Sequence, residues 1–296
     1  MTIAATCQSN GDLRRFAPAK INLFLHVTGR RADGYHEIES WVTFVDVGDE
    51  ITVIPSESLS LVVEGPFAHS LRASCSSEDN LIIRAARALA QATGQPARGS
   101  IRLTKNLPLA SGLGGGSSDA AAVLLLLAKL WQLDFPAERM TSLGLALGAD
   151  VPVCLRASSH WVRGTGESLT AASFPSAVVV LVWPAIPLST AQVFGALRRK
   201  ESSPLLCPST WTNLHQAADW LRSCRNELEE PARMLAPPVG EALRALSQQE
   251  DCLLARMSGS GSTCFGLFAH REPAIRASEE LRSTYPGWWI RVAAGL

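Results

Sequence analysis

The sequence predicts a two-domain α+β protein, and three observations support this fold class. Residues 21–63 alternate in a way that is typical of strands, and residues 252–293 follow the order strand, turn, strand, helix, strand. That order predicts helices on one face of an antiparallel sheet. A glycine-serine loop at residues 107–118 runs directly into a strongly apolar helix. The chain of 296 residues is long enough for two domains, which we place at residues 1–170 and 171–296.

The first stretch is rich in strand patterns. Residues 21–27 alternate strictly, with the apolar side chains of Ile21, Leu23, Leu25 and Val27 on one face. Lys20 and Asn22 therefore point together from the other face. Further strands are predicted over residues 38–45, 51–54 and 59–63, separated by turn signals at Gly48-Asp49 and Pro55-Ser56.

The middle of the chain predicts helices with start and stop signals. Asp79 caps a helix over residues 80–92, which Gly94 ends. Residues 101–104 form a strand that leads into the glycine loop. A helix over residues 136–147 ends at Gly148, and Asp150 suits the N-cap of a short helix that follows. Residues 160–169 predict a hairpin about Gly164-Thr165-Gly166.

The second half begins with a buried strand over residues 178–183. Ser189 and Gln192 form a capping box for a helix through Arg198, and a loop rich in Ser and Pro extends to about residue 208. The remaining predicted elements are helices over 213–221, 227–235 and 239–247, strands over 252–257 and 263–268, a helix over 273–283 and a strand over 288–293.

The loop LPLASGLGGGSSD at residues 107–119 is predicted to bind a phosphate. Gly112, Gly114, Gly115 and Gly116 lack the Cβ atoms that would keep a ligand from the backbone, and they allow positive φ. Ser117 or Ser118 then caps a helix whose positive dipole end faces the same space. A flexible linker is the alternative, but linkers do not normally end at a capped apolar helix.

The loop is not one of the commoner nucleotide motifs. It lacks the Gly-Lys-Ser/Thr ending of a Walker A loop and the last glycine of the Rossmann fingerprint. The chain contains neither His-Arg-Asp nor Asp-Phe-Gly, which argues against the protein-kinase fold. Another nucleotide-binding fold is therefore expected.

Composition favours a small-molecule ligand. Lys plus Arg (27) balance Asp plus Glu (27), and no basic run is interleaved with aromatics, so neither a nucleic-acid nor a membrane partner is expected. The seven cysteines are scattered without a Cys-x-x-Cys pair and are expected to be free thiols. The N-terminus lacks a signal-peptide core and no apolar stretch has membrane-spanning length, which predicts a cytoplasmic protein.

Three segments together carry a family resemblance. They are PAKINLFL at residues 18–25, LPLASGLGGGSSDAAA at 107–122 and MSGSGST at 257–263. In this order they resemble the three motifs of the GHMP small-molecule kinase superfamily. The resemblance implies a ribosomal-protein-S5-like N-terminal domain and a ferredoxin-like C-terminal domain, with the active site in the cleft between them. It also implies ATP and Mg²⁺ as cofactors; the metal ligands are left open, with Asp119 as one candidate.

Within the superfamily, the chain resembles one branch in particular. Two segments carry this closer resemblance: PAKINLFLHVTGRRADGYHEIES and LGADVPVCL. They resemble the branch that transfers a phosphoryl group from ATP to the 2-hydroxyl of a cytidine-diphosphate derivative of methylerythritol, in the non-mevalonate isoprenoid pathway. The alternatives are a GHMP kinase for homoserine, mevalonate or a sugar, and a non-catalytic binding protein of the same fold. The expected oligomeric state is a monomer or a weak homodimer.

The resemblance implies catalytic roles for Asp150 and Lys20. A carboxylate orients the acceptor hydroxyl or takes its proton, and a lysine favours the anionic transition state. The alternatives are a simple N-cap for Asp150 and a solvated strand-end side chain for Lys20. Asn22, on the same strand face as Lys20, would orient the acceptor.

The resemblance also implies the binding residues. Tyr35 would stack on the cytosine, His36 would hydrogen-bond its edge, and Phe194 would cover the other face with Thr190 alongside; a core residue is the alternative for Phe194. The glycine loop would hold the ATP phosphates, and Gly259, Ser260 and Gly261 would close around substrate phosphates unless they only form a hairpin. Asp119 either approaches magnesium or only favours the helix N-terminus. The residues implied for ATP are Asn80, Leu81, Lys105, Pro108, Leu109, Ala110, Ser111, Gly112, Leu113, Gly114, Gly115, Gly116, Ser117 and Ser118.

Overall fold

The computed structural model describes residues 6–7, 12–76, 78–198, 202–203, 205–206, 208 and 210–295. The chain divides into two compact units, each built from several segments. Unit 1 comprises residues 1–19, 48–109 and 114–157, and unit 2 comprises residues 20–47, 110–113 and 158–296. The predicted division at residues 1–170 and 171–296 stays a prediction.

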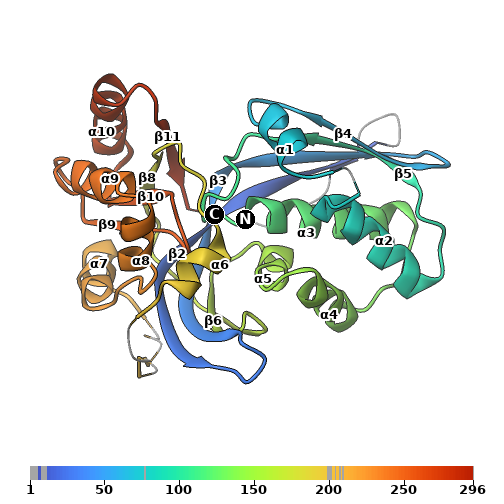
Figure 1. Ribbon diagram of the computed structural model, residues 1–296, viewed down its shortest axis with the longest axis horizontal. Coiled ribbons are helices and arrows are strands. Elements are labelled where there is room, and N and C mark those ends of the chain that lie inside the picture. The colour runs from blue at the N-terminus through green and yellow to red at the C-terminus, as the bar shows by residue number, and fades with distance from the viewer. Residues whose placement is uncertain are drawn as a thin grey trace. The chain divides into compact units, whose positions relative to one another are not determined.

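Unit 1 contains strands covered by helices. β4 (Leu59–Glu64) pairs in parallel with β5 (Gly99–Thr104), and β5 pairs antiparallel with the second half of β3 (His36–Ile54). Figure 1 shows α2 and α3 beneath β4 and β5, next to α4 and α5. The helices of this unit are α1 (Ala68–Ser74), α2 (Leu81–Thr93), α3 (Gly115–Leu130), α4 (Ala137–Leu147) and α5 (Val151–Arg156).

The ends of α2 follow from local chemistry, with one correction. Asn80, not the predicted Asp79, is the N-cap, because its side chain accepts a hydrogen bond from the Ile82 N–H. Gly94 ends the helix in the left-handed conformation with φ +69°, as predicted. The short helix α1 was not predicted, because its sequence has neither a capping side chain nor a clear apolar stripe.

The turn predicted at Gly48-Asp49 is wrong, because β3 continues through both residues. The glycine is needed there for close packing instead. A Cβ on Gly48 would lie 2.2 Å from the Ala17 carbonyl oxygen and 2.8 Å from Pro18 Cα. The preceding strand is also longer than predicted. β2 (Leu13–Arg30) includes residues 13–20, which lie before the alternating pattern at residues 21–27.

Unit 2 contains an antiparallel four-stranded sheet in the order β11-β8-β10-β9. Its strands are β8 (Val178–Trp183), β9 (Leu254–Met257), β10 (Cys264–Phe268) and β11 (Trp289–Ala294). When the four strands are numbered by their order in the chain, they lie in the sheet in the order 4-1-3-2, which is the order of a ferredoxin-like sheet. The α+β prediction for the end of the chain is therefore confirmed.

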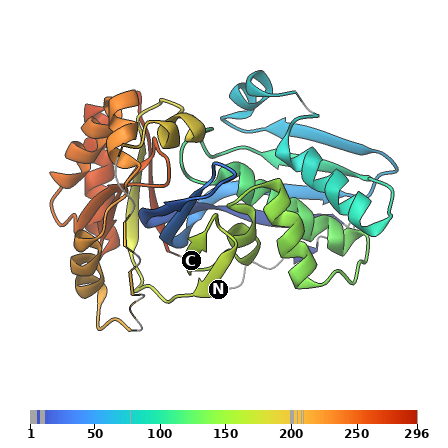
Figure 2. The same cartoon turned by 60° about the horizontal axis from the view of Figure 1, so that its bottom comes forward.

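Helices cover one face of this sheet. α9 (Pro238–Ser247) contacts β9 and β10, and α10 (Arg271–Thr284) contacts β8 and β11 (Figures 1 and 2). A core of small and branched apolar side chains fills the space, including Val180, Val239 and Leu281. The other helices of the unit are α6 (Thr190–Gly195), α7 (Leu214–Ser223) and α8 (Glu229–Leu235). The Ser189 side chain caps α6, as predicted.

A second core of unit 2 is aromatic. β6 (His160–Gly164) pairs with the first half of β3 and with β7 (Ser168–Ala171), which confirms the predicted hairpin. The indole rings of Trp41, Trp161, Trp211 and Trp220 lie in contact, with centroids 5.6 to 6.2 Å apart. Edge-to-face and tilted contacts of this kind stabilise a core beyond the area they bury.

Within the described residues, no helix is long and apolar enough to cross a membrane. The five cysteines whose side chains are described are free thiols: Cys75, Cys154, Cys224, Cys252 and Cys264. Cys207 lies outside the described residues.

Candidate active site

In unit 2, parts of the three motifs come together through backbone hydrogen bonds. The Lys20 N–H donates to the Leu113 carbonyl at 2.8 Å, and the Thr263 N–H donates to the Ser111 carbonyl at 2.9 Å. The Ser258 hydroxyl accepts from the Asn22 N–H at 3.2 Å and donates to the Gly112 carbonyl at 3.0 Å. Segments that are far apart in sequence are therefore held side by side.

Glycines make this packing sterically feasible. A Cβ on Gly112 would lie 2.3 Å from the Ser258 carbonyl oxygen, and φ there is +78°. Gly261, with φ +82°, would meet the Met257 sulfur at 2.6 Å. A side chain at either position would separate the loop at residues 110–113 from the loop at 258–261.

Lys20 and Asn22 are buried on β2, with exposed fractions of 4% and 2%. The alternative for Lys20, a lysine at the solvated end of a strand, is therefore wrong.

The Leu188 N–H also donates to the Ala110 carbonyl at 2.9 Å. The third motif is buried as well, since Ser260 is 8% exposed and its hydroxyl shares a 2.8 Å hydrogen bond with the Thr190 hydroxyl.

The residues predicted to bind the cytosine are not arranged as a simple clamp of two rings. Tyr35 is 65% exposed at a tight turn, where its N–H donates to the Asp33 carboxylate. The rings of His36 and Phe194 stack directly on each other, with centroids 4.9 Å apart and planes inclined by 24°. Partial burial, and then the charge of Arg30, lower the pKa of His36 below its usual value. His36 is therefore mainly neutral at pH 7 and has one donor and one acceptor nitrogen.

In unit 1, α3 begins without a serine cap. Gly114 is the N-cap residue, with φ +63°, and no side chain makes a capping hydrogen bond. The prediction that Ser117 or Ser118 caps the helix is wrong, because both lie inside α3, where the Ser118 N–H donates to the Gly114 carbonyl. Ser118 is buried, Ser117 is half-buried, and Gly116 is exposed with open space where its Cβ would be. Pro108 is buried and Leu109 half-buried at the start of the loop.

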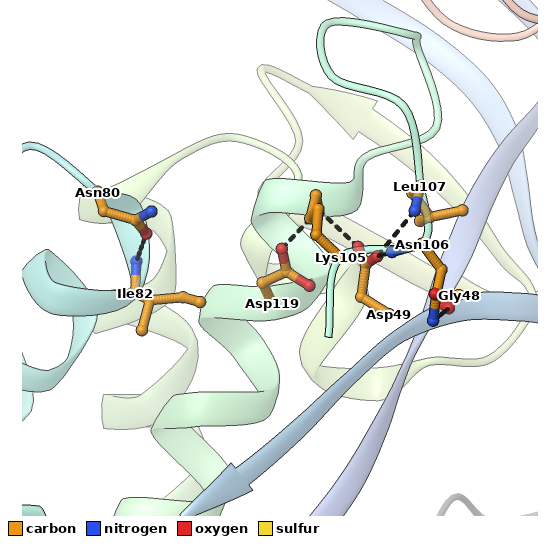
Figure 3. Close-up of polar contacts among 8 residues, drawn as sticks. All are labelled: Gly48, Asp49, Asn80, Ile82, Lys105, Asn106, Leu107 and Asp119. Carbon is orange, nitrogen blue, oxygen red and sulfur yellow. Dashed lines mark hydrogen bonds and ion pairs between the residues drawn. The ribbon is translucent and has the colours of Figure 1, made fainter. Parts of the chain in front are cut away.

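The side chain of Lys105 lies in a buried charge cluster, which we define as Asp49, Lys105 and Asp119 (Figure 3). The Lys105 Nζ donates to Asp49 Oδ2 at 2.5 Å and to Asp119 Oδ2 at 2.7 Å. Asp49 Oδ1 accepts from the N–H groups of Asn106 and Leu107 at 2.6 and 2.9 Å. The cluster therefore ties the end of β5 to the first turns of α3.

The cluster is also electrostatically strained. Burial by itself would lower the pKa of Lys105, but Asp119 and Asp49 outweigh it, so the pKa is raised and the ammonium is fully charged. Burial and then the Asp49 carboxylate raise the pKa of Asp119 well above its usual value. One cation thus stabilises two neighbouring carboxylates that are almost inaccessible to water.

Asn80 and Leu81 lie at the start of α2. The Asn80 side-chain oxygen is occupied by the Ile82 N–H (Figure 3), and the residue is 8% exposed. Leu81 is half-buried. The role of both residues, and that of Lys105, in binding adenine stays a prediction.

Asp150 precedes α5 in the N-cap position, but its side chain makes no capping hydrogen bond. Its backbone is held firmly, since its carbonyl accepts from the Cys154 N–H at 3.1 Å and the next residue, Val151, donates to the Gly148 carbonyl at 3.0 Å. The half-buried carboxylate is therefore not used for capping, which was the simple alternative to a chemical role.

Three polar residues of these arrangements were missed by sequence reasoning. The sequence predicts a turn at Asp49, although the residue is 0% exposed and bonds Lys105. Ser40 and Ser258 lie in segments that carry the family resemblance but were given no role, and both are 0% exposed. No local signal separates Asp49 from its acidic neighbours Asp46 and Glu50 in the same strand, so the sequence alone does not single it out.

Comparison with known proteins now identifies the class. The family model of the GHMP kinases N terminal domain matches residues 80–158, and that of the GHMP kinases C terminal domain matches residues 205–287. The chain therefore belongs to the GHMP kinase family of ATP-dependent small-molecule kinases. The predicted two-domain GHMP kinase fold and the predicted enzyme class are confirmed.

Particular relatives are similar over nearly the whole chain. A protein of Cereibacter sphaeroides named 4-diphosphocytidyl-2-C-methyl-D-erythritol kinase is 50% identical over 94% of this chain and 97% of its own length. A crystal structure of 4-(cytidine 5'-diphospho)-2C-methyl-D-erythritol kinase is 35% identical, with a TM-score of 0.77 over 96% of this chain and 99% of that one. A homoserine kinase from Cytophaga hutchinsonii, at 17% identity and a TM-score of 0.70 over 98% and 96%, shares the fold.

Proposed function

We propose that this kinase transfers the γ-phosphoryl group of ATP to the 2-hydroxyl of 4-diphosphocytidyl-2-C-methyl-D-erythritol. The observation that carries the proposal is the 50% identity, over 94% of the chain, to a relative of that name. The reaction would place the protein in the non-mevalonate route to isoprenoid precursors. We also propose a cytoplasmic location and a monomer or weak homodimer.

Asp150 is the proposed base. Phosphoryl transfer depends mostly on positioning and charge stabilisation, with one carboxylate to orient or accept the proton of the attacking hydroxyl. Support comes from the half-buried Asp150 carboxylate, which takes no part in capping α5. Lys20 would stabilise the negative charge that develops on the transferred group.

ATP is proposed to bind by its phosphates at the glycine loop and the start of α3. Support comes from the exposed, unobstructed Gly116 and from the N-terminal N–H groups of a 16-residue helix, which favour an anion. Magnesium would neutralise the phosphate charge. We propose that it is held mainly by phosphate oxygens and water, as is usual for Mg²⁺ in kinases. Asp119 is not proposed as a direct ligand, because its carboxylate is buried and bonded to Lys105.

The cytosine is proposed to bind at Tyr35, His36, Thr190 and Phe194. Support comes from the exposed ring of Tyr35 and from the stacked His36–Phe194 pair, which offers a second flat surface in the same unit. A neutral His36 has the donor and acceptor that the polar edge of cytosine requires.

Tyr35→Ala is expected to weaken binding of the cytidine substrate by about 1 to 3 kcal/mol, because a base loses one stacking surface. Tyr35→Phe keeps the ring and is expected to cost much less. Titration calorimetry with each variant measures both effects, and ATP affinity serves as the internal control. Equal losses for Ala and Phe would assign the effect to the hydroxyl, and an unchanged affinity for Ala would place the cytosine elsewhere.

The direct test of the proposed function is a transfer assay. The purified protein is incubated with ATP, magnesium and a panel of alcohols: the cytidine-diphosphate methylerythritol, homoserine, mevalonate and galactose. Mass spectrometry then identifies which alcohol gains a phosphate. Phosphorylation of another member of the panel in preference to the cytidine compound would overturn the proposal.

A further inference from the structure

The side-chain amide of Asn22 has a fixed orientation, which a chain of two hydrogen bonds imposes. Asn22 Nδ2 lies 2.7 Å from Ser40 Oγ, and Ser40 Oγ lies 2.6 Å from the Phe24 carbonyl oxygen. The carbonyl only accepts, so the single hydroxyl proton of Ser40 is donated to Phe24. Ser40 Oγ can then only accept from Asn22, which must present its NH₂ group. Hydrogen-bond partners decide the two ends of an amide in this way.

The other end of the amide is left facing the third motif. Asn22 Oδ1 is buried and has no hydrogen-bond partner among the described residues. It lies 3.2 Å from the point where a Cβ on Gly259 would stand. A buried acceptor without a donor is unfavourable, so a ligand that brings a donor to this oxygen gains affinity.

The backbone of Asn22 holds this oxygen in place. The Asn22 N–H donates to Ser258 Oγ, whose own proton goes to the Gly112 carbonyl. Both ends of the residue are therefore tied to buried serine hydroxyls, since Ser40 and Ser258 are each 0% exposed. The oxygen is presented by a rigid strand and is not free to exchange places with the NH₂ group.

We propose that Ser40 is a positioning residue for the acceptor substrate: it keeps the carbonyl oxygen of Asn22, and not its NH₂ group, directed at a hydroxyl of the bound alcohol. This inference rests on the proposed function only in requiring, as the acceptor, an alcohol with at least two hydroxyl groups. The reacting hydroxyl has one proton, which goes to the base. The hydroxyl that donates to Asn22 is therefore a second, non-reacting hydroxyl, and the site selects a polyol.

Ser40→Ala removes the acceptor that fixes the amide. The NH₂ group of Asn22 then loses its partner, and the amide rotates or binds the hydroxyl less well. We expect the KM for the alcohol to rise about tenfold, which corresponds to 1.4 kcal/mol, while the KM for ATP stays unchanged. Ser40→Thr keeps the hydroxyl on a strand-compatible side chain and is expected to restore the KM to within about twofold. Ser60→Ala, which removes an exposed strand serine, is the matched control.

A double-mutant cycle separates positioning from a general effect on folding. In an Asn22→Ala background Ser40 has nothing to orient, so adding Ser40→Ala is expected to change the KM for the alcohol no further. An analogue that lacks the relevant non-reacting hydroxyl is expected to bind wild type and Ser40→Ala equally. Circular dichroism of each variant confirms that it is folded.

Three results would overturn the proposal: an unchanged KM in Ser40→Ala, equal effects of Ala and Thr, or the same tenfold loss in the Asn22→Ala background. An unchanged KM would also mean that a water, and not the substrate, binds Asn22 Oδ1. If the transfer assay identifies a different alcohol that has a second hydroxyl, such as mevalonate or galactose, the same comparison is made with that alcohol. Failure of the proposed substrate and failure of the Ser40 role are thereby distinguished.

Discussion

Asp150→Asn is expected to lower the turnover number by about 10²- to 10⁴-fold, the usual contribution of a general base. The amide has nearly the shape of the carboxylate but cannot accept the proton. Because the Asp150 side chain makes no capping hydrogen bond, α5 is not expected to unfold. Steady-state kinetics at saturating ATP and alcohol measure the turnover, and calorimetry checks that both ligands still bind.

Asp134→Asn is the matched control, since it removes an exposed carboxylate from the same unit. Its turnover is expected to stay at the wild-type level. A turnover in Asp150→Asn within a few-fold of the control would remove Asp150 from the chemistry. A loss of ligand affinity that accounts for the whole decrease would instead make it a binding residue.

Lys105→Met is expected to lower the free energy of unfolding by about 3 to 5 kcal/mol, because removing one partner of a buried ion pair leaves uncompensated charge. Here two carboxylates, Asp49 and Asp119, lose the cation to which both bond. Methionine fills a similar volume, so a cavity contributes little. Urea denaturation followed by far-ultraviolet circular dichroism gives the free energy.

The pH dependence tests the electrostatic cause. The pKa of Asp119 is already raised in the folded protein and rises further without Lys105. Such a carboxyl holds its proton in the folded state at a pH where the unfolded chain has released it, so stability falls as pH rises from about 4. The loss in Lys105→Met is therefore expected to be smaller at pH 5 than at pH 8.

Two variants serve as controls for the charge cluster. Lys129→Met removes an exposed lysine from the same helix as Asp119 and is expected to change stability by less than about 0.5 kcal/mol. Adding Asp119→Asn to Lys105→Met removes one unpaired charge and is expected to recover part of the stability. A Lys105→Met variant as stable as Lys129→Met at every pH would contradict the interpretation.

Local sequence signals predicted most elements of the fold. The capping serine at Ser189 and the glycine that ends α2 act through their immediate neighbours, so their effects are readable from the chain alone. The errors fall where distant residues decide. Gly48 looks like a turn but allows the chain at Ala17 and Pro18 to approach closely. At α3, Gly114 adopts the left-handed conformation and displaces the two serines from the cap.

The candidate site was predicted unevenly for a similar reason. Motif residues such as Lys20, Asn22 and the glycine loop were identified because their spacing is characteristic. Asp49 and Ser40 were missed, since each matters only through a partner that the fold brings near: Lys105 for Asp49, and Asn22 for Ser40. The direct stacking of His36 on Phe194 is likewise a contact between distant parts of the sequence.

The aromatic core of unit 2 has a spectroscopic consequence. Trp131 is the one tryptophan within residues 1–19, 48–109 and 114–157, and the chain's other tryptophans belong to unit 2. Intrinsic fluorescence therefore reports chiefly on unit 2, where the neighbouring indoles also exchange excitation energy. The start of α3 and the buried charge cluster contribute almost nothing to this fluorescence, except through Trp131. The indole N–H of Trp131 donates to the Arg98 carbonyl. Loss of structure in unit 1 alone would leave most of the emission unchanged.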